Sequence, residues 1–208
     1  MLLVIGNKNY SSWSLRPWIA MKLFGFDFDE KRIALDEPGT RNAILGHSPA
    51  GKVPVLVDGK TTVWDSLAIL EYLGERNRKL WPADPAERAR ARSVAAEMHS
   101  GFPSLRQHMS MNVRKRYPGK GRTPEVLAEI ERIKSIWNEA RKPFLFGAFT
   151  AADAMYAPVV LRFRTYEVEL PRAARSYYDA MLELPAMQEW IAAAERETES
   201  IPQFDMYE

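Results

Sequence analysis

The pattern of apolar residues changes once along the chain, and this change limits the folds that the chain can adopt. Up to about residue 80, short apolar runs typical of strands alternate with helical stretches. Beyond residue 85 the strand signals nearly vanish, and apolar residues recur at three- and four-residue spacing. The expected strands lie at 2–5, 28–35, 53–57 and 61–64, and the expected helices at 13–24, 42–45, 65–75, 85–116 (with a bend near Gly101 and Pro103), 124–142, 151–166, 172–182 and 185–197.

The first half is predicted to form a small mixed sheet. The run Leu2–Ile5 is continuously apolar, as in a strand buried on both faces, and the pair Asp58-Gly59 between two strand-like runs is a hairpin signal. A right-handed βαβ unit followed by a hairpin and a helix is the thioredoxin-like pattern. We therefore expect an α/β thioredoxin-like domain (β-α-β-α-β-β-α) over 1–78, a linker over 79–85, and an all-α domain over 86–208.

Composition excludes several classes of function. The 208 residues include no cysteine, so the chain has no thiolate nucleophile, disulfide or sulfur-ligated metal site of its own. With 29 basic and 27 acidic residues, the net charge of +2 is too balanced to indicate a nucleic acid or a membrane surface as partner. His99 and His108 lack a carboxylate at ligand spacing, so no metal site is expected. No signal peptide or membrane span is recognisable, which favours a cytoplasmic location.

A serine-rich loop leads from the first strand into the first helix. Serine is a preferred N-cap, and Pro17 is tolerated near a helix start, so the helix should begin near Ser12–Ser14. Capping alone explains serines at this place. The alternative is that hydroxyls and backbone N–H groups at the positive helix end stabilise an anion such as a thiolate.

Two further features lie at the ends of predicted elements. Pro54 opens a strand and is compatible with a trans bond at a sheet edge or with a cis bond that leaves the backbone of Val53 free for an extended ligand. Asp65-Ser66 heads a helix, where Ser66 is expected to cap it, either as a cap alone or while its N–H and hydroxyl also receive a ligand carboxylate and Asp65 holds an ammonium group.

A capping box, Thr150-Ala-Ala-Asp153, heads a later helix, and we assign it to folding alone.

The order and spacing of these features resemble the glutathione transferase family over essentially the whole chain. The most specific part is the run 51–56 (GKVPVL) followed by 65–73 (DSLAILEYL), which is similar to the glutathione-binding half of that family. The stretch 11–16 (SSWSLR) resembles the serine-type members, theta- and zeta-like, and their bacterial relatives. Residues 144–147 (FLFG) before the capping box are also typical of the family.

The resemblance implies a site for glutathione as co-substrate. It assigns the γ-glutamyl group to Asp65 and Ser66, the cysteinyl backbone to Val53 beside Pro54, and the glycyl carboxylate to Lys52. It also implies that a serine hydroxyl at the first helix donates to the sulfur. Matching zeta members selects Ser11, which we favour, and counting back from Arg16 as in theta members selects Ser12.

The resemblance further implies the reaction and the partners. The leading interpretation is a glutathione transferase that activates the thiol as thiolate against small hydrophobic electrophiles, with a role in detoxification, as a homodimer. The electrophile pocket should be lined by His99, Phe102 and Arg106 at helical spacing. The alternatives are a zeta-like cis–trans isomerase of the maleylacetoacetate type, and a transferase-fold binding or regulatory protein without turnover. Trp13 stands where zeta members carry a cysteine, which weighs against the isomerase.

Overall fold

The computed structural model describes residues 1–207, and its first half contains the expected mixed sheet. The strands β1 (Leu2–Ile5), β2 (Asp29–Arg32), β3 (Val55–Asp58) and β4 (Thr61–Trp64) lie in the order β2-β1-β3-β4. β1 pairs parallel with β2 and antiparallel with β3, which pairs antiparallel with β4. The helices of this half are α1 (Ser12–Leu23), α2 (Thr40–Leu45) and α3 (Ser66–Arg76), so the order β-α-β-α-β-β-α is confirmed.

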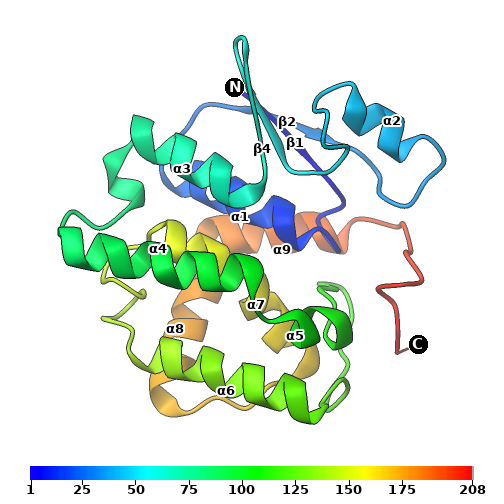
Figure 1. Cartoon of the computed structure of the whole chain (residues 1–208). Coiled ribbons are helices and arrows are strands. Elements are labelled where there is room, and N and C mark those ends of the chain that lie inside the picture. The colour runs from blue at the N-terminus through cyan, green and yellow to red at the C-terminus, as the bar shows by residue number, and fades with distance from the viewer. Residues whose placement is uncertain (208) are drawn as a thin grey trace.

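The sheet is covered on both faces because side chains alternate along each strand. Leu3, Ile5 and Leu56 pack into the main core together with α1 and α3. Val4 and Val55 point to the other face, where they form a second cluster with Ile44 of α2. The hairpin at Asp58–Thr61 rises at the edge of the sheet (Figure 1).

Helices make up the regular structure after the sheet. A single 3₁₀ turn, Arg78–Leu80, lies in the connecting segment. The helices that follow are α4 (Pro85–Ser100), α5 (Pro103–His108), α6 (Pro124–Asn138), α7 (Ala151–Tyr166), α8 (Arg172–Glu183) and α9 (Pro185–Glu195). The chain is thus a thioredoxin-like domain followed by an all-helical domain, as predicted, while the exact limits at 78 and 86 stay predictions. Within residues 1–207, no helix is both long and apolar enough to cross a bilayer.

The expected long helix 85–116 is wrong in its second part. α4 ends at Ser100 because Gly101 and Phe102 leave helical geometry, with Phe102 at a φ of +57°, and Pro103 then starts the short α5. After His108 the chain is irregular up to the start of α6. Ser110 and Met111 of this irregular stretch line a cavity of about 670 Å³.

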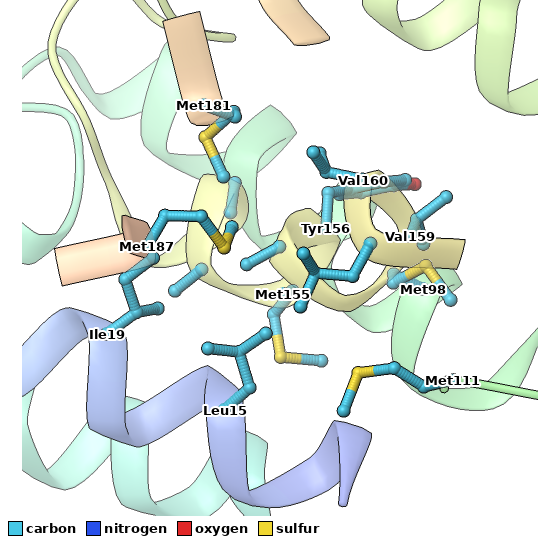
Figure 2. Packing of buried hydrophobic residues seen from close by; sticks show 14 of the residues in the cluster. Leu15, Ile19, Met98, Met111, Met155, Tyr156, Val159, Val160, Met181 and Met187 are labelled. Carbon is cyan, nitrogen blue, oxygen red and sulfur yellow. The ribbon is translucent and has the colours of Figure 1, made fainter. Parts of the chain in front are cut away.

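The main core joins the two domains. α1 packs against α7, which also packs against α4, so α7 lies at the centre of the molecule (Figure 1). Figure 2 shows Leu15 and Ile19 of α1 on the side of Met155 of α7. Met98, Met111, Met181 and Met187 surround them from four other segments (Figure 2). The start of α1 is therefore held against the helical domain.

Candidate functional site

The serines at the start of α1 do not cap the helix with their side chains. Ser11 occupies the N-cap position, but its hydroxyl makes no capping bond. Its Oγ lies 2.7 Å from Oγ of Ser14, which accepts the backbone N–H of Gly6 at 3.1 Å. The predicted helix start is confirmed, since α1 begins at Ser12. Ser11 lines a cavity, and its hydroxyl forms no capping bond to the backbone of the helix.

Ser12 lies beside a buried positive charge from the helical domain. Nη2 of Arg162, on α7, lies 3.3 Å from the Ser12 hydroxyl and donates to it, and Nη1 donates to the carbonyl of Met109. Burial, and then the charge of Arg106, lower the pKa of Arg162 to about 10, which leaves it protonated at neutral pH. No carboxylate among residues 1–207 forms an ion pair with Arg162. A buried cation without a carboxylate beside it favours the binding of another anion in its neighbourhood.

A second buried arginine connects the starts of α1 and α3. Arg16 is fully buried, its guanidinium stacks over the Trp13 ring at 4.2 Å, and Nη1 donates to the Ser66 hydroxyl at 3.3 Å. Burial, and then the charges of Arg106 and Arg162, lower the pKa of Arg16 to about 9. Arg106 covers the same Trp13 ring at 5.1 Å. Two cations therefore contact the ring of Trp13.

Asp65, and not Ser66, caps α3. One carboxylate oxygen of Asp65 accepts the backbone N–H groups of Leu67 and Ala68 at 2.9 and 3.3 Å. The expectation that Ser66 serves as the cap is wrong, because Ser66 is the first residue of the helix and Asp65 occupies the N-cap position. The second oxygen of Asp65 lies 3.3 Å from Nε2 of His99. The carboxylate thus bridges its own helix and the helical domain.

The peptide bond between Val53 and Pro54 is cis, which decides between the two geometries that the sequence allowed. Val53 stands just before the ladder between β1 and β3, which begins at Val55.

Two neighbouring cavities meet at the same three residues. A larger one of about 670 Å³ and a smaller one of about 300 Å³ share Trp13, Lys52 and Val53. Of the predicted site residues, the larger cavity is lined by Ser11, Ser12, Lys52, Val53 and Arg106. The smaller one is lined by Lys52, Val53, Pro54, Asp65, Ser66 and His99. The structure therefore brings together almost all of the predicted residues.

Two predicted pocket residues lie elsewhere. His99 lines the smaller cavity beside Asp65 and Trp13, and not the larger cavity where Arg106 lies. Phe102 lines neither cavity, because its positive φ turns the chain after α4 and its ring joins the core. The helical spacing used to group these residues does not continue past Ser100.

Sequence reasoning missed several residues of the larger cavity, among them Tyr10, Arg41, Ser110, Met111, Arg162 and Phe204. A signal for Arg162 was present, since it interrupts the apolar stretch 154–163 of a helix that is buried almost throughout. A charged side chain in such a buried stretch is rare unless it is paired with another polar or charged group. For Phe204 the sequence holds no local signal.

The last residues of the chain hold the loop that carries the serines. The ring of Phe204 stacks on Tyr10 at 5.7 Å between centroids, and the Tyr10 hydroxyl donates to the Asp205 carboxylate at 2.9 Å. Asn112 donates to the same carboxylate at 2.7 Å. The Glu197 carboxylate accepts the backbone N–H groups of residues 8 and 9 at 2.7 and 2.9 Å. The position of Ser11, next to Tyr10, thus depends on a segment nearly 190 residues away.

Comparisons with known proteins agree with this architecture. Maleylacetoacetate isomerase of Rattus norvegicus is 29% identical over 190 residues, covering 86% of this chain and 87% of that protein. The structure of a maleyl pyruvate isomerase, a bacterial zeta-class glutathione S-transferase, aligns with a TM-score of 0.73 at 23% identity and covers 96% of this chain and all of that one. A glutathione transferase homologue from Burkholderia with bound glutathione aligns with a TM-score of 0.70 at 22% identity, covering 93% and 96%.

Family models match both halves of the chain. The model of the glutathione S-transferase N-terminal domain matches residues 10–76, and the model of the C-terminal domain matches residues 85–193, which is more than half of the 208 residues. The absence of cysteine fits the serine-type members. The chain belongs to the glutathione S-transferase family.

Proposed function

We propose that the protein binds glutathione across the two cavities and activates its thiol for attack on a small electrophile. The observation that carries this proposal is the meeting of the cavities at Trp13, Lys52 and Val53. Asp65 and Ser66, which suit the ammonium and carboxylate groups of a γ-glutamyl residue, line the smaller cavity, and Ser11 and Ser12 line the larger one. An extended tripeptide that bridges the two places its sulfur near the start of α1. A similar structure contains bound glutathione, which supports this choice of ligand.

The γ-glutamyl end fits the smaller cavity. The ammonium group pairs with the Asp65 carboxylate, replacing or sharing its contact with His99. The carboxylate accepts from the Ser66 hydroxyl, whose hydrogen is available because its oxygen accepts from Arg16. The buried charge of Arg16 behind Ser66 adds a positive potential that favours a carboxylate there.

The middle and the far end of glutathione fit the segment before β3. Val53, held outside the ladder by its place before Pro54, offers backbone groups to the cysteinyl residue. Lys52, which lines both cavities, is within reach of the glycyl carboxylate.

The central chemical task is to lower the pKa of the thiol. A free thiol has a pKa near 8.5, so only a few per cent is ionised at neutral pH. The Ser11 hydroxyl donates to the sulfur, the α1 N-terminus adds its dipole, and Arg162 adds a full positive charge nearby. Ser12 is the alternative donor, because its oxygen accepts from Arg162 and leaves its hydrogen free.

The reaction then needs no protein nucleophile. The thiol proton leaves to solvent when glutathione binds, and the sulfur lone pair forms a bond to the electrophilic carbon. The electron pair of the broken bond leaves with the displaced group, or protonation from solvent completes an addition to a double bond. The larger cavity holds the electrophile against the sulfur.

A glutathione-dependent isomerisation is a second candidate, favoured by the cations of the larger cavity. Arg106 and Arg162 line that cavity, and such a lining suits an electrophile that carries a carboxylate. The relative named maleylacetoacetate isomerase agrees with this chemistry. Here the thiolate adds to a double bond, the adduct rotates, and elimination returns the thiolate. Glutathione is then not consumed.

The first test is retention on immobilised glutathione followed by a panel of electrophiles with and without carboxylates. Conjugation consumes one glutathione per turnover, whereas isomerisation proceeds with catalytic amounts, so thiol counting separates the two candidates. Binding without any turnover favours a regulatory role. Failure to bind glutathione by calorimetry contradicts the proposal as a whole.

The variant Ser11→Ala tests the assignment of the donor. We expect glutathione affinity within a few fold of the wild type, but a thiol pKa in the complex raised by about one unit, since a hydrogen bond to a charged sulfur is lost. The measurement is a pH titration of the ultraviolet thiolate absorbance of bound glutathione; the cysteine-free chain contributes no thiol of its own. An unchanged titration curve excludes Ser11 as the donor.

We also propose a homodimer in the cytoplasm, as the family resemblance implies. Light scattering coupled to gel filtration tests the dimer, and a monomer at micromolar concentration contradicts it.

A further inference from the structure

Ser14 is a buried serine that has no place in the mechanism above. It lies in the first turn of α1, is 0% exposed and lines neither cavity of the site. Its Oγ accepts the N–H of Gly6 at 3.1 Å and lies 2.7 Å from Oγ of Ser11. Either hydroxyl is able to donate in the second contact. The direction of this one hydrogen bond decides where the hydrogen of Ser11 points.

Burial sets the direction of the bond between the two serines. If Ser11 donates, the hydrogen of Ser14 has no other acceptor among residues 1–207 and no access to solvent, which is unfavourable. If Ser14 donates, its hydroxyl is fully satisfied, with one hydrogen given and one accepted. The hydrogen of Ser11 is then free to point into the larger cavity, which Ser11 lines. In the second arrangement only the hydrogen of Ser11 lacks a protein acceptor in the part of the chain that the structure describes, and Ser11 lines the cavity, where a ligand can accept it.

We propose that Ser14 is a positioning residue that directs the Ser11 hydroxyl toward the sulfur of the bound thiol. The hydrogen bonds then run in one direction, from Gly6 N–H to Ser14, from Ser14 to Ser11, and from Ser11 to the sulfur. Bonds aligned in this way polarise one another, so the last donor is strengthened. This inference rests on the proposed function, because it needs a thiolate at Ser11. Ser14 itself touches neither ligand.

A double-mutant cycle tests the inference on the full-length protein with glutathione bound. The variants are Ser11→Ala, Ser14→Ala and the double variant, and the quantity is the pKa of the bound thiol from thiolate absorbance. For Ser14→Ala we expect the pKa to rise by about 0.5 to 1 unit, which lowers the thiolate fraction at neutral pH, and with it kcat/KM, by at most roughly three- to tenfold. Because Ser14 acts only through Ser11, adding Ser14→Ala to Ser11→Ala should change the pKa no further. Glutathione affinity by calorimetry should remain within about twofold.

Further variants separate positioning from folding. Ser14→Thr keeps a hydroxyl and should keep the thiol pKa of the wild type, although its methyl group lowers Tm. If Ser14→Ala does not fold, Ser14→Cys replaces it, close in size and with a weak hydrogen donor. The pH profile of kcat/KM, which a cysteine absorbance does not disturb, should then shift upward.

The outcomes distinguish this inference from the proposed function. A wild-type complex without thiolate at neutral pH contradicts the proposed function. A Ser11→Ala shift with no Ser14→Ala shift, or equal and additive shifts in the cycle, contradicts only the role of Ser14.

Discussion

The helices α1 and α7 pack against each other, and both begin with hydroxyl residues, yet the two starts use them differently. At α7 the Asp153 carboxylate accepts the backbone N–H and the hydroxyl of Thr150 at 2.8 and 2.9 Å, and the N–H of Leu145 at 3.0 Å. At α1 the N-cap Ser11 makes no side-chain capping bond. The polar groups at the start of α7 are used in folding, whereas the Ser11 hydroxyl at the start of α1 contacts, among the polar groups of residues 1–207, only the Ser14 hydroxyl and lies at a cavity wall. Polar residues at a helix start therefore indicate a ligand only when the helix does not use them.

The largest loss of stability is expected where the helix uses all of its polar groups. Asp153→Ala leaves buried donors of Thr150 and Leu145 without an acceptor and should lower the free energy of unfolding by about 3–4 kcal/mol. Asp153→Asn keeps one acceptor oxygen and should lose about half as much. Urea unfolding followed by circular dichroism measures both. A loss below about 1 kcal/mol for Asp153→Ala means that water replaces the carboxylate, and the contrast with α1 then disappears.

The same carboxylate makes stability depend on pH. Burial outweighs the hydrogen bonds to Asp153 and raises its pKa to about 6, whereas in the unfolded chain the usual value is about 3.9. Between these values the folded state holds a proton that the unfolded state has lost, so this contribution falls as pH rises through the window. Across this window the free energy of unfolding falls by about 2–3 kcal/mol, and the fall levels off above about pH 6. The difference in unfolding free energy between wild type and Asp153→Asn, measured at several pH values, should follow this curve; a constant difference shows that the Asp153 pKa is normal.

Much of the fold was predictable because local patterns encode it. Leu2–Ile5, the hairpin strand Thr61–Trp64 and the helix Ala151–Tyr166 have the predicted limits, since apolar periodicity and turn or cap residues act within a few positions. The edge strand Asp29–Arg32 is shorter than the predicted 28–35, and its four residues are all charged and exposed.

The site was predictable mainly where sequence neighbours form it. Asp65 with Ser66, and Val53 with Pro54, lie together on the chain and line the smaller cavity together. The walls of the larger cavity come from distant segments, such as Arg162 on α7 and Phe204 near the end of the chain. The hydrogen bond from Tyr10 to the Asp205 carboxylate forms only when distant segments fold together, and no local periodicity encodes such a contact.

α3 stands between the two extremes, because Asp65 divides its carboxylate between a cap and the smaller cavity. Asp65→Ala should lose about 1 kcal/mol of stability from the cap and, under the proposed function, at least about tenfold in glutathione affinity. Asp65→Asn keeps a capping oxygen without the charge, so stability should stay within about 0.5 kcal/mol while affinity still falls. Calorimetry with glutathione and thermal unfolding measure the two effects. If Asp65→Ala and Asp65→Asn lose the same affinity and do not differ in stability, the Asp65 cap does not stabilise α3.

Ser12→Ala should have the smallest effect on stability, below about 0.5 kcal/mol, because Ser12 caps nothing and its partner Arg162 keeps a second acceptor at Met109. Its effect on the bound thiol separates the two serines. If Ser11 is the donor, the thiol pKa in Ser12→Ala should stay within about 0.3 unit, since Arg162 retains its charge and only reorients slightly. A shift of about one unit, together with an unchanged titration in Ser11→Ala, transfers the donor role to Ser12. In that case Arg162 of α7 acts on the thiolate through its hydrogen bond to Ser12 in addition to its positive charge.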